Sequence, residues 1–241
     1  MKKRMAWLLA AFILVILLGL VAQFVLKPER WQQRGVVSFL PEVMARVDTD
    51  SLAIALTIDD APHPAVTPHI LEILRRHGAR ATFFIIGSQA EAYPDLLQAI
   101  VDDGHELGNH LYLDRPSIQL EDDEFVESLL RTDALIRPLG PVQWCRPGSG
   151  WLDERMIELM AEHGYRPCLA SVYPLDLTTP RKMATWHFEI NAKPGAILVL
   201  HDGGLARLGT LETLEIVLPR LSEDGLRAVT VTELVGMAHP E

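Results

Sequence analysis

Two adjacent carboxylates follow a buried apolar run and are the residues best suited to chemistry in this chain. Asp59 and Asp60 come shortly after residues 52–56, whose side chains are all apolar. Such a run predicts a buried strand that delivers both acids to a cleft. Neighbouring acids can divide their roles, one binding a metal ion and the other acting as a general base. The alternative is a strand that ends in an ordinary turn, because Asp and Pro are common turn residues.

Three later segments also place polar groups after apolar runs. His110 and Asp114 are four residues apart, so a helical turn would let both side chains reach one ion. Arg146 ends a short strand signal, and two glycines follow it that leave the backbone open to a ligand. His201 ends the apolar run 196–200 and can change its charge near neutral pH. A histidine at a strand end is more often structural than catalytic, but four such clusters favour a shared site.

Strand and helix signals alternate along the chain from residue 52. The expected strands are 52–58, 81–86, 105–109, 142–145, 165–170, 196–200 and 227–230. The expected helices are 68–77, with Thr67 as N-cap, and 94–103, 121–137, 153–163 and 210–222. This alternation predicts an α/β fold with a parallel sheet, closed or nearly closed into a barrel. In such barrels the chemistry lies at the carboxyl ends of the strands, where all four clusters fall.

The ordered clusters resemble the motifs of the polysaccharide deacetylases, also called the NodB-homology family or carbohydrate esterase family four. The matching segments are Thr57–Pro62, His110 with Asp114, Arg146–Pro147 and Leu198–His201. Their order and spacing are more specific than any one of them. The resemblance covers about residues 50–238 and implies a distorted (β/α)7 barrel, with a catalytic domain over 51–238.

The resemblance also implies catalytic roles, position by position. Asp59 matches the catalytic base, and Arg146 matches the arginine that orients it. His201 matches the general acid, and Asp176 resembles the aspartate that the family places beside that histidine. Ser149 stands where the family commonly has a tyrosine, but the role there uses the backbone N–H and tolerates the change.

The metal site implied by the resemblance departs from the family pattern. Its ligands are Asp60, His110 and Asp114, and Asp114 stands where the family usually has a second histidine. Two carboxylates and one imidazole form a harder ligand set, which lowers the penalty for Mn²⁺, Fe²⁺ or Co²⁺ relative to Zn²⁺. The expected cofactor is one divalent ion, with Zn²⁺ first and Mn²⁺, Fe²⁺ or Co²⁺ as alternatives. Leu177 also replaces the tryptophan that usually walls the substrate groove, which indicates a changed sugar specificity.

The predicted reaction is the hydrolysis of an N-acetyl group. With an ion on its three ligands, a water and the acetyl carbonyl can bind beside Asp59, which takes a proton from the water. A backbone N–H near Ser149 helps to stabilise the negative charge on the carbonyl oxygen, by roughly a few kcal/mol per donor. His201, kept protonated by Asp176, donates a proton to the departing amine. The products are acetate and a free amino sugar.

Composition limits the other possibilities. The chain has 241 residues, a net charge of −10 and no basic cluster outside its N-terminal flank, which argues against a nucleic-acid partner. No repeat or low-complexity segment indicates a second domain. Cys145 and Cys168 permit a disulfide, but buried free thiols are favoured. No protein partner is predicted.

The N-terminal segment predicts a membrane anchor. Three basic residues precede residues 5–26, an apolar run broken only by Gln23 and long enough to cross a bilayer. The small-residue cleavage pattern is poor, so a retained anchor is favoured over a cleaved signal peptide that would leave a secreted protein. Residues 27–50 then form a linker, and the catalytic domain is expected outside the cytoplasm.

Three functions are compatible with these residues. The favoured one is a metal-dependent hydrolase that removes N-acetyl groups from a chitin-like or peptidoglycan-like glycan. The second is a membrane-anchored glycan-binding pseudoenzyme, suggested by the departures at Asp114 and Leu177. The third is a related hydrolase of a small amide. Asp59, Arg146 and His201 favour an enzyme, because a binding protein needs neither a base nor an acid.

Overall fold

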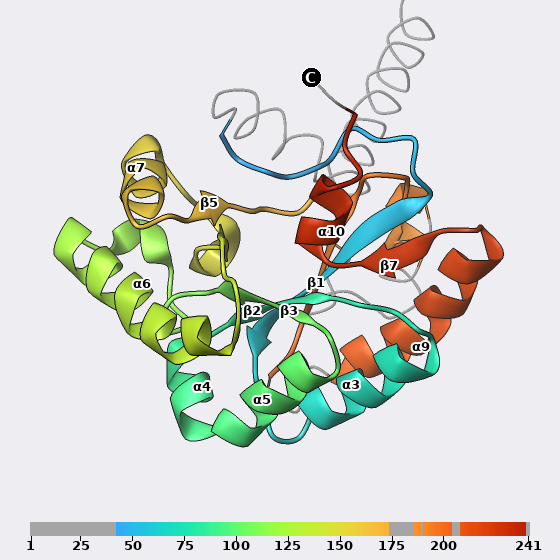
Figure 1. Cartoon of the computed structure of the whole chain (residues 1–241), viewed down its shortest axis with the longest axis horizontal. Helices are drawn as coiled ribbons and strands as arrows, with labels where there is room; N and C mark the ends of the chain where they lie inside the picture. Colours follow the sequence, from blue (N-terminus) through green and yellow to red (C-terminus); the bar gives the residue numbers. More distant parts are fainter. Residues whose placement is uncertain (1–41, 174–185, 189, 204–207, 240–241) are drawn as a thin grey trace, which may run out of the picture.

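The described part of the chain is a parallel α/β sheet flanked by helices. The computed structural model describes residues 42–173, 186–188, 190–203 and 208–239. Within these ranges seven strands form one sheet in the order β5-β4-β3-β2-β1-β6, and β7 also pairs with β1. Every strand pairing is parallel, as regular β-α alternation requires. Figure 1 shows α6, α4, α5, α3 and α9 arranged in an arc around the strands.

The elements have the following bounds. The strands are β1 (Ala53–Ala61), β2 (Thr82–Ile85), β3 (Glu106–Asn109), β4 (Trp144–Cys145), β5 (Arg166–Pro167), β6 (Ile197–His201) and β7 (Arg227–Val229). The α-helices are α3 (Thr67–Arg76), α4 (Gly87–Ala92), α5 (Pro94–Asp102), α6 (Asp122–Ile136), α7 (Glu154–Glu162), α9 (Leu208–Glu223) and α10 (Val231–Val235). Short 3-10 helices are η2 (Ser117–Gln119), η3 (Arg137–Leu139) and η4 (Gly148–Gly150).

All expected strands and helices are present, but the short helices α4 and α10 and the helical residues 186–188 and 190–191 were not predicted. The helix α4 has only six residues and no clear apolar period. The helix α10 begins with a capping box. The Thr230 side chain accepts a hydrogen bond from the Glu233 N–H, and the Glu233 side chain accepts one from the Thr230 N–H. That pattern was available in the sequence. The expected N-cap Thr67 is instead the first residue of α3, after Val66.

The predicted barrel does not close. The path of paired strands ends at β5 on one side and at β6 on the other. Among the described residues this opening is crossed by isolated bridges and their hydrogen bonds, not by a paired strand: Val172 with Leu198, Met44 with Cys168 and Arg46 with Ala196. The expected strand 165–170 is only two residues long. Backbone groups of the next two residues form hydrogen bonds outside the sheet. Leu169 N–H donates to Met44, and the Cys168 carbonyl accepts from a side chain.

Residues 42–50, which were expected to belong to a linker, pack on the domain. Val43, Ala45 and Val47 are each 4% exposed, and Val47 N–H donates to the Gly195 carbonyl. The domain therefore begins before residue 51. The predicted membrane span, residues 5–26, lies outside the described residues, and no helix within the described ranges is long and apolar enough to cross a bilayer.

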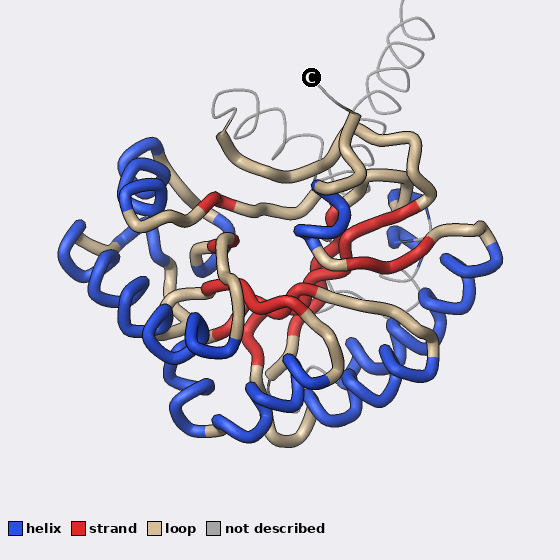
Figure 2. The backbone as a smooth tube through the Cα atoms, viewed as in Figure 1, coloured by secondary structure: helices blue, strands red, loops and turns tan. Residues whose placement is uncertain are grey.

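The strand β1 is central and buried along its whole length. It pairs with β2, β6 and β7, which explains why its residues are apolar on both faces up to the acids. Figure 2 shows the strands inside the arc of helices. Alternate residues of β1 face two core regions: Ile54, Leu56 and Ile58 belong to one, and Ala53 and Ala55 belong to the other. By this alternation Asp59 lies on the face of Ala53 and Ala55.

The two cysteines are free thiols in the interior, as favoured by the sequence. Both are buried, and neither is in a disulfide. Cys145 belongs to the same core region as Ile54, whereas Cys168 belongs to the region of Ala55, so the two side chains lie on opposite faces of the sheet. Burial raises the pKa of the Cys168 thiol to about 11, which keeps it protonated at neutral pH.

Candidate active site

Asp59 and Arg146 form a buried ion pair at the carboxyl ends of β1 and β4. Arg146 Nη1 donates to Asp59 Oδ1 at 2.6 Å and to Thr57 Oγ1 at 2.8 Å. The same guanidinium donates to the Cys168 carbonyl at 2.9 Å and to the Leu169 carbonyl at 3.3 Å. Four oxygen acceptors therefore fix the plane of Arg146, which fixes Asp59 in turn. The structure brings together the predicted base and its orienting residue.

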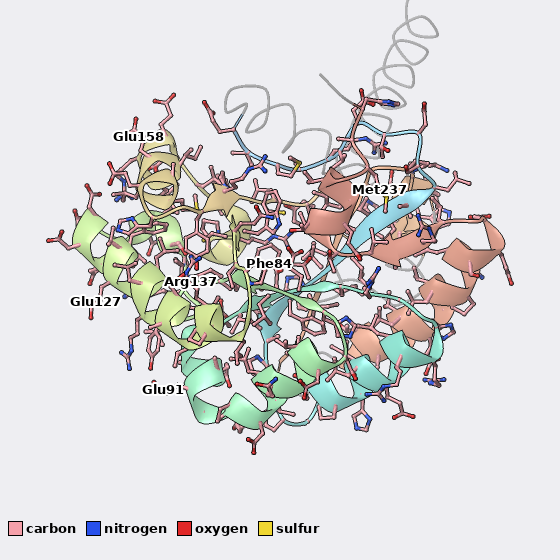
Figure 3. All side chains as sticks on the ribbon, in the orientation of Figure 1. Phe84, Glu91, Glu127, Arg137, Glu158 and Met237 are labelled. Atoms are coloured by element: carbon pink, nitrogen blue, oxygen red, sulfur yellow. The ribbon has the colours of Figure 1, made fainter. Side chains whose placement is uncertain are left out.

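The aromatic ring of Phe84 lies under this ion pair. The Arg146 guanidinium carbon is 4.1 Å from the ring centroid, a distance at which the ring face attracts a cation. Figure 3 labels Phe84 near the centre of the molecule, and Arg146 is only 2% exposed. Because the pair is shielded from water, the orientation of the Asp59 carboxylate is held more strongly than at a surface. Asp59 Oδ2 receives no hydrogen bond from the described residues, so it remains available as a proton acceptor.

His201 lies directly beside Asp59 on the neighbouring strand. The register of β1 and β6 makes the two residues Cα partners, and strands pair about 4.8 Å apart. His201 follows Ile197 and Val199 in alternation, and both of these face the same core region as Ala55. The predicted acid and the predicted base therefore project from the same face of adjacent strands.

Asp60 and His110 also meet, at the ends of β1 and β3. His110 Nε2 is 3.3 Å from Asp60 Oδ1, and His110 Nδ1 is 2.5 Å from the Arg146 carbonyl. A carbonyl only accepts, so Nδ1 must carry the hydrogen and Nε2 faces the carboxylate. Burial alone would lower the pKa of His110, but the carboxylates of Asp60 and Asp59 raise it above its ordinary value.

This pair fits two ligands of a divalent ion. Two ligand atoms bound tetrahedrally to Zn²⁺ lie about 3.4 Å apart, close to the 3.3 Å between His110 Nε2 and Asp60 Oδ1. A hydrogen bond from the far ring nitrogen to a carbonyl is the usual support of a metal-bound histidine, and His110 has one to Arg146. These two side chains therefore have both the spacing and the orientation that a metal site needs.

Asp114 does not join them. It is exposed in the loop after β3, and among the described residues no three His, Cys, Asp or Glu side chains are close enough to hold one ion. The prediction of Asp114 as a ligand required a helical turn from His110 to Asp114, but residues 112–115 form bends. Of the three predicted ligands, the structure thus brings together Asp60 and His110 but not Asp114.

The loop that carries Ser149 is tightly packed against the loop after β3. Gly148 N–H donates to Ser117 Oγ at 2.8 Å, and a Cβ at Gly148 would lie 2.4 Å from the Arg115 carbonyl oxygen. Only glycine fits there. Gly150 N–H donates to the Pro147 carbonyl at 3.1 Å, which forms a short 3-10 turn with Ser149 at its exposed centre.

In the described part of the chain, three residues other than glycine have left-handed backbone conformations, and each lies at the candidate site. They are Asp60 with φ 66°, Leu111 with φ 64° and Ser149 with φ 66°. This conformation costs roughly 1–3 kcal/mol for a residue with a Cβ, and such residues concentrate at functional sites. The first belongs to the candidate metal pair, the second follows His110, and the third presents the predicted oxyanion N–H.

Asp202, the residue after His201, was not predicted to belong to the site. It is fully buried, its N–H donates to the Asp59 carbonyl at 2.7 Å, and its Oδ2 accepts from the Thr67 hydroxyl and from His63 N–H. Its Oδ1 has no hydrogen-bond partner among the described residues, and burial raises its pKa to about 7. Asp202 thus ties the segment after β1 to β6. Its position in an otherwise apolar strand end was the available signal.

Two predicted residues, Asp176 and Leu177, lie outside the described residues. The proposed partner of His201 and the altered groove wall therefore have no structural description. Their roles stay predictions.

The family model described as polysaccharide deacetylase matches residues 46–168 of this chain. A peptidoglycan-N-acetylglucosamine deacetylase of Bacillus cereus is 36% identical over 206 residues, which cover 80% of this chain and 92% of that protein. A chitooligosaccharide deacetylase of Azorhizobium caulinodans is 37% identical over 198 residues, which cover 75% of this chain and 93% of that protein.

Solved structures show the same fold. The crystal structure of a peptidoglycan N-acetylglucosamine deacetylase superposes with a TM-score of 0.76 at 26% identity, over 83% of this chain and 95% of that one. A pseudoenzyme of carbohydrate esterase family four from Bacillus anthracis superposes with a TM-score of 0.75 at 26% identity, over 82% of this chain and 70% of that one. A mutant of that pseudoenzyme with restored enzymatic activity has a TM-score of 0.75 at 28% identity, over 82% of this chain and 72% of that one.

Proposed function

Because this chain belongs to the polysaccharide deacetylase family, we propose that it removes N-acetyl groups from an amino-sugar glycan with the help of one divalent ion. The family and the hydrolase class expected from the motifs are confirmed. The observation that best supports turnover is the buried pair of Arg146 and Asp59, at 2.6 Å, beside His201. A protein that only bound glycan would have no need for an oriented carboxylate next to a histidine.

In the proposed mechanism, Asp59 accepts a proton from the attacking water. Arg146 holds Asp59 Oδ1, which leaves Oδ2 to accept the proton, and the carboxylate is positioned before substrate binds. His201, on the neighbouring strand, donates a proton to the leaving nitrogen. The N–H of Ser149 stabilises the oxyanion, and the left-handed backbone there aims this donor.

Asp60 and His110 are the two side chains that would hold the ion. A divalent ion held there would polarise the acetyl carbonyl and lower the pKa of the attacking water. Asp114 remains the predicted third ligand. A zinc enzyme usually supplies three protein ligands, and no other described His, Cys, Asp or Glu completes the pair.

Metal analysis of three variants tests this assignment. We expect Asp60→Asn and His110→Gln each to lose the ion, because each removes one of the two ligands that already face each other. Asp114→Ala should also lose the ion and the activity, because two side chains alone hold a divalent ion weakly. The measurements are metal content per chain after gel filtration and acetate release. If Asp114→Ala keeps full metal content and full activity, Asp114 is no ligand.

The pseudoenzyme remains the second candidate. It is supported by the exposed position of Asp114 and by the existence of a pseudoenzyme with the same fold. In the deciding assay the parent chain is first loaded with Zn²⁺ or Mn²⁺. It is then given three kinds of substrate in parallel: N-acetylglucosamine oligomers, peptidoglycan and a small N-acetyl amide. Acetate release from a glycan supports the proposed function. Release from the small amide alone supports the third candidate, and glycan binding without release supports the pseudoenzyme.

We further propose that residues 5–26 anchor the protein in a membrane, with the catalytic domain outside the cytoplasm. The support is the length and apolarity of this run in the sequence. Deleting residues 1–26 should convert a membrane-bound chain into a soluble one with unchanged kcat on a soluble oligomer. Fractionation and N-terminal sequencing check this. A soluble full-length product that has been cut near residue 22 would instead indicate a signal peptide.

A further inference from the structure

An exposed tryptophan stands next to the candidate site without a partner in the described part of the chain. Trp151 is 64% exposed, the most exposed of the large hydrophobic side chains that the structure describes. Its indole makes no hydrogen bond, ring contact or cation contact with the described residues. A single exposed hydrophobic residue is ordinary, so its surroundings decide its meaning.

The position of Trp151 is fixed relative to the reacting groups. It follows Ser149 by two residues, so their Cα atoms are at most about 7 Å apart. The turn before it is closed by the hydrogen bond from Gly150 to Pro147. After it, Leu152 is buried, and Asp153 caps α7 by accepting from Met156 N–H at 2.9 Å. The backbone is therefore anchored on both sides while the ring stays in solvent.

Other exposed apolar side chains lie on the adjoining loop. Leu113 is 47% exposed and Ile118 is 38% exposed, and both belong to the loop that follows β3. The hydrogen bond between Ser117 and Gly148 holds this loop against the one that carries Trp151. The apolar residues thus occupy the two loops that follow the strands of His110 and Arg146.

We propose that Trp151 is the platform on which the sugar ring next to the deacetylated residue stacks. This inference rests on the proposed function. The flat face of a pyranose carries C–H groups, and an indole face removes that apolar surface from water. A rigid aromatic side chain does this with little loss of conformational freedom. Stacking on a neighbouring ring favours oligomers over monomers, because only an oligomer fills that position.

The test compares Trp151→Ala and Trp151→Phe with the parent full-length chain, loaded with its metal, on the monomer and the tetramer of N-acetylglucosamine. We expect Trp151→Ala to raise KM for the tetramer about tenfold, equivalent to about 1.4 kcal/mol, with kcat within about twofold. Its kcat/KM on the monomer should not change. Trp151→Phe should keep most of the affinity for the tetramer. An unchanged KM for the tetramer in Trp151→Ala overturns the proposal.

Trp186→Ala is the matched control. Trp186 is 43% exposed, and Phe188, two residues later, lines a hollow with the C-terminal half of α9 that contains none of the candidate site residues. This variant should match the parent on both substrates.

If the parent releases no acetate from any glycan, the proposed function fails, and calorimetric binding of the tetramer then decides the role of Trp151. About tenfold weaker binding by Trp151→Ala supports the platform, whereas equal binding, or none by the parent, overturns it.

Discussion

Asp59→Asn is expected to lower turnover by about two to four orders of magnitude while leaving metal content and fold intact. The amide has nearly the shape of the carboxylate, and its oxygen can still accept the hydrogen bond from Arg146 Nη1 that Asp59 Oδ1 now accepts at 2.6 Å. It cannot take a proton from water, however. The measurements are kcat for acetate release, metal per chain and the midpoint of thermal unfolding.

Asp60→Asn is the matched comparison for this experiment. Both substitutions remove one negative charge from neighbouring positions on β1, but only Asp60 faces His110 Nε2. Asp60→Asn should therefore lose metal, whereas Asp59→Asn should retain it. Equal loss of metal in the two variants would show that base and ligand have been assigned to the wrong acids.

Arg146→Met is expected to be the most destabilising single substitution at the site, by about 3–5 kcal/mol in the free energy of unfolding. The methionine fills part of the volume but leaves the Asp59 carboxylate buried without its partner. It also leaves the Cys168 and Leu169 carbonyls without their donor. Chemical denaturation monitored by circular dichroism measures the change.

Arg75→Met is the control, because its ion pair has the same length in a different environment. Arg75 Nη2 is 2.6 Å from Asp103 Oδ2, but the arginine side chain is 64% exposed. Such a surface pair contributes roughly 0–1 kcal/mol. The double variant Arg146→Met with Asp59→Asn adds a second check: it should recover part of the lost stability, since the unpaired charge is gone. No recovery would mean that the lost backbone hydrogen bonds, not the charge, dominate.

The sequence predicted the strands and much of the site, because both depend on local patterns. An apolar run such as 52–56 indicates a buried strand, and regular alternation with helices makes the sheet parallel. Carboxyl ends of parallel strands share one edge, so Asp59, His110 and Arg146 were expected to meet there, and they do. The convergence of these three residues does not depend on the conformation of the loops.

The remainder depends on contacts between distant segments, which spacing does not specify. Asp202 could not be recognised as a tie to Thr67, because that contact depends on how α3 begins and on the register of β1 with β6. The opening between β5 and β6 was missed because backbone groups directly after β5 bond to Arg146 and to residue 44, and the chain reaches β6 only through the short contact of residues 171–172. Asp114 was placed by assuming a helical turn that the loop does not form.

The left-handed residues at the site also bear on how this protein would respond to selection for heat resistance. Leu111 is a fully buried leucine with φ 64°, directly after His110. Glycine would remove the backbone penalty there but would leave a cavity where the side chain packs and would release the backbone torsions that aim His110. At Ser149, which is exposed, glycine carries no packing cost. A screen for thermostability alone would therefore favour glycine at Ser149 first, and the proposed oxyanion donor would lose rigidity while the free energy of unfolding rose.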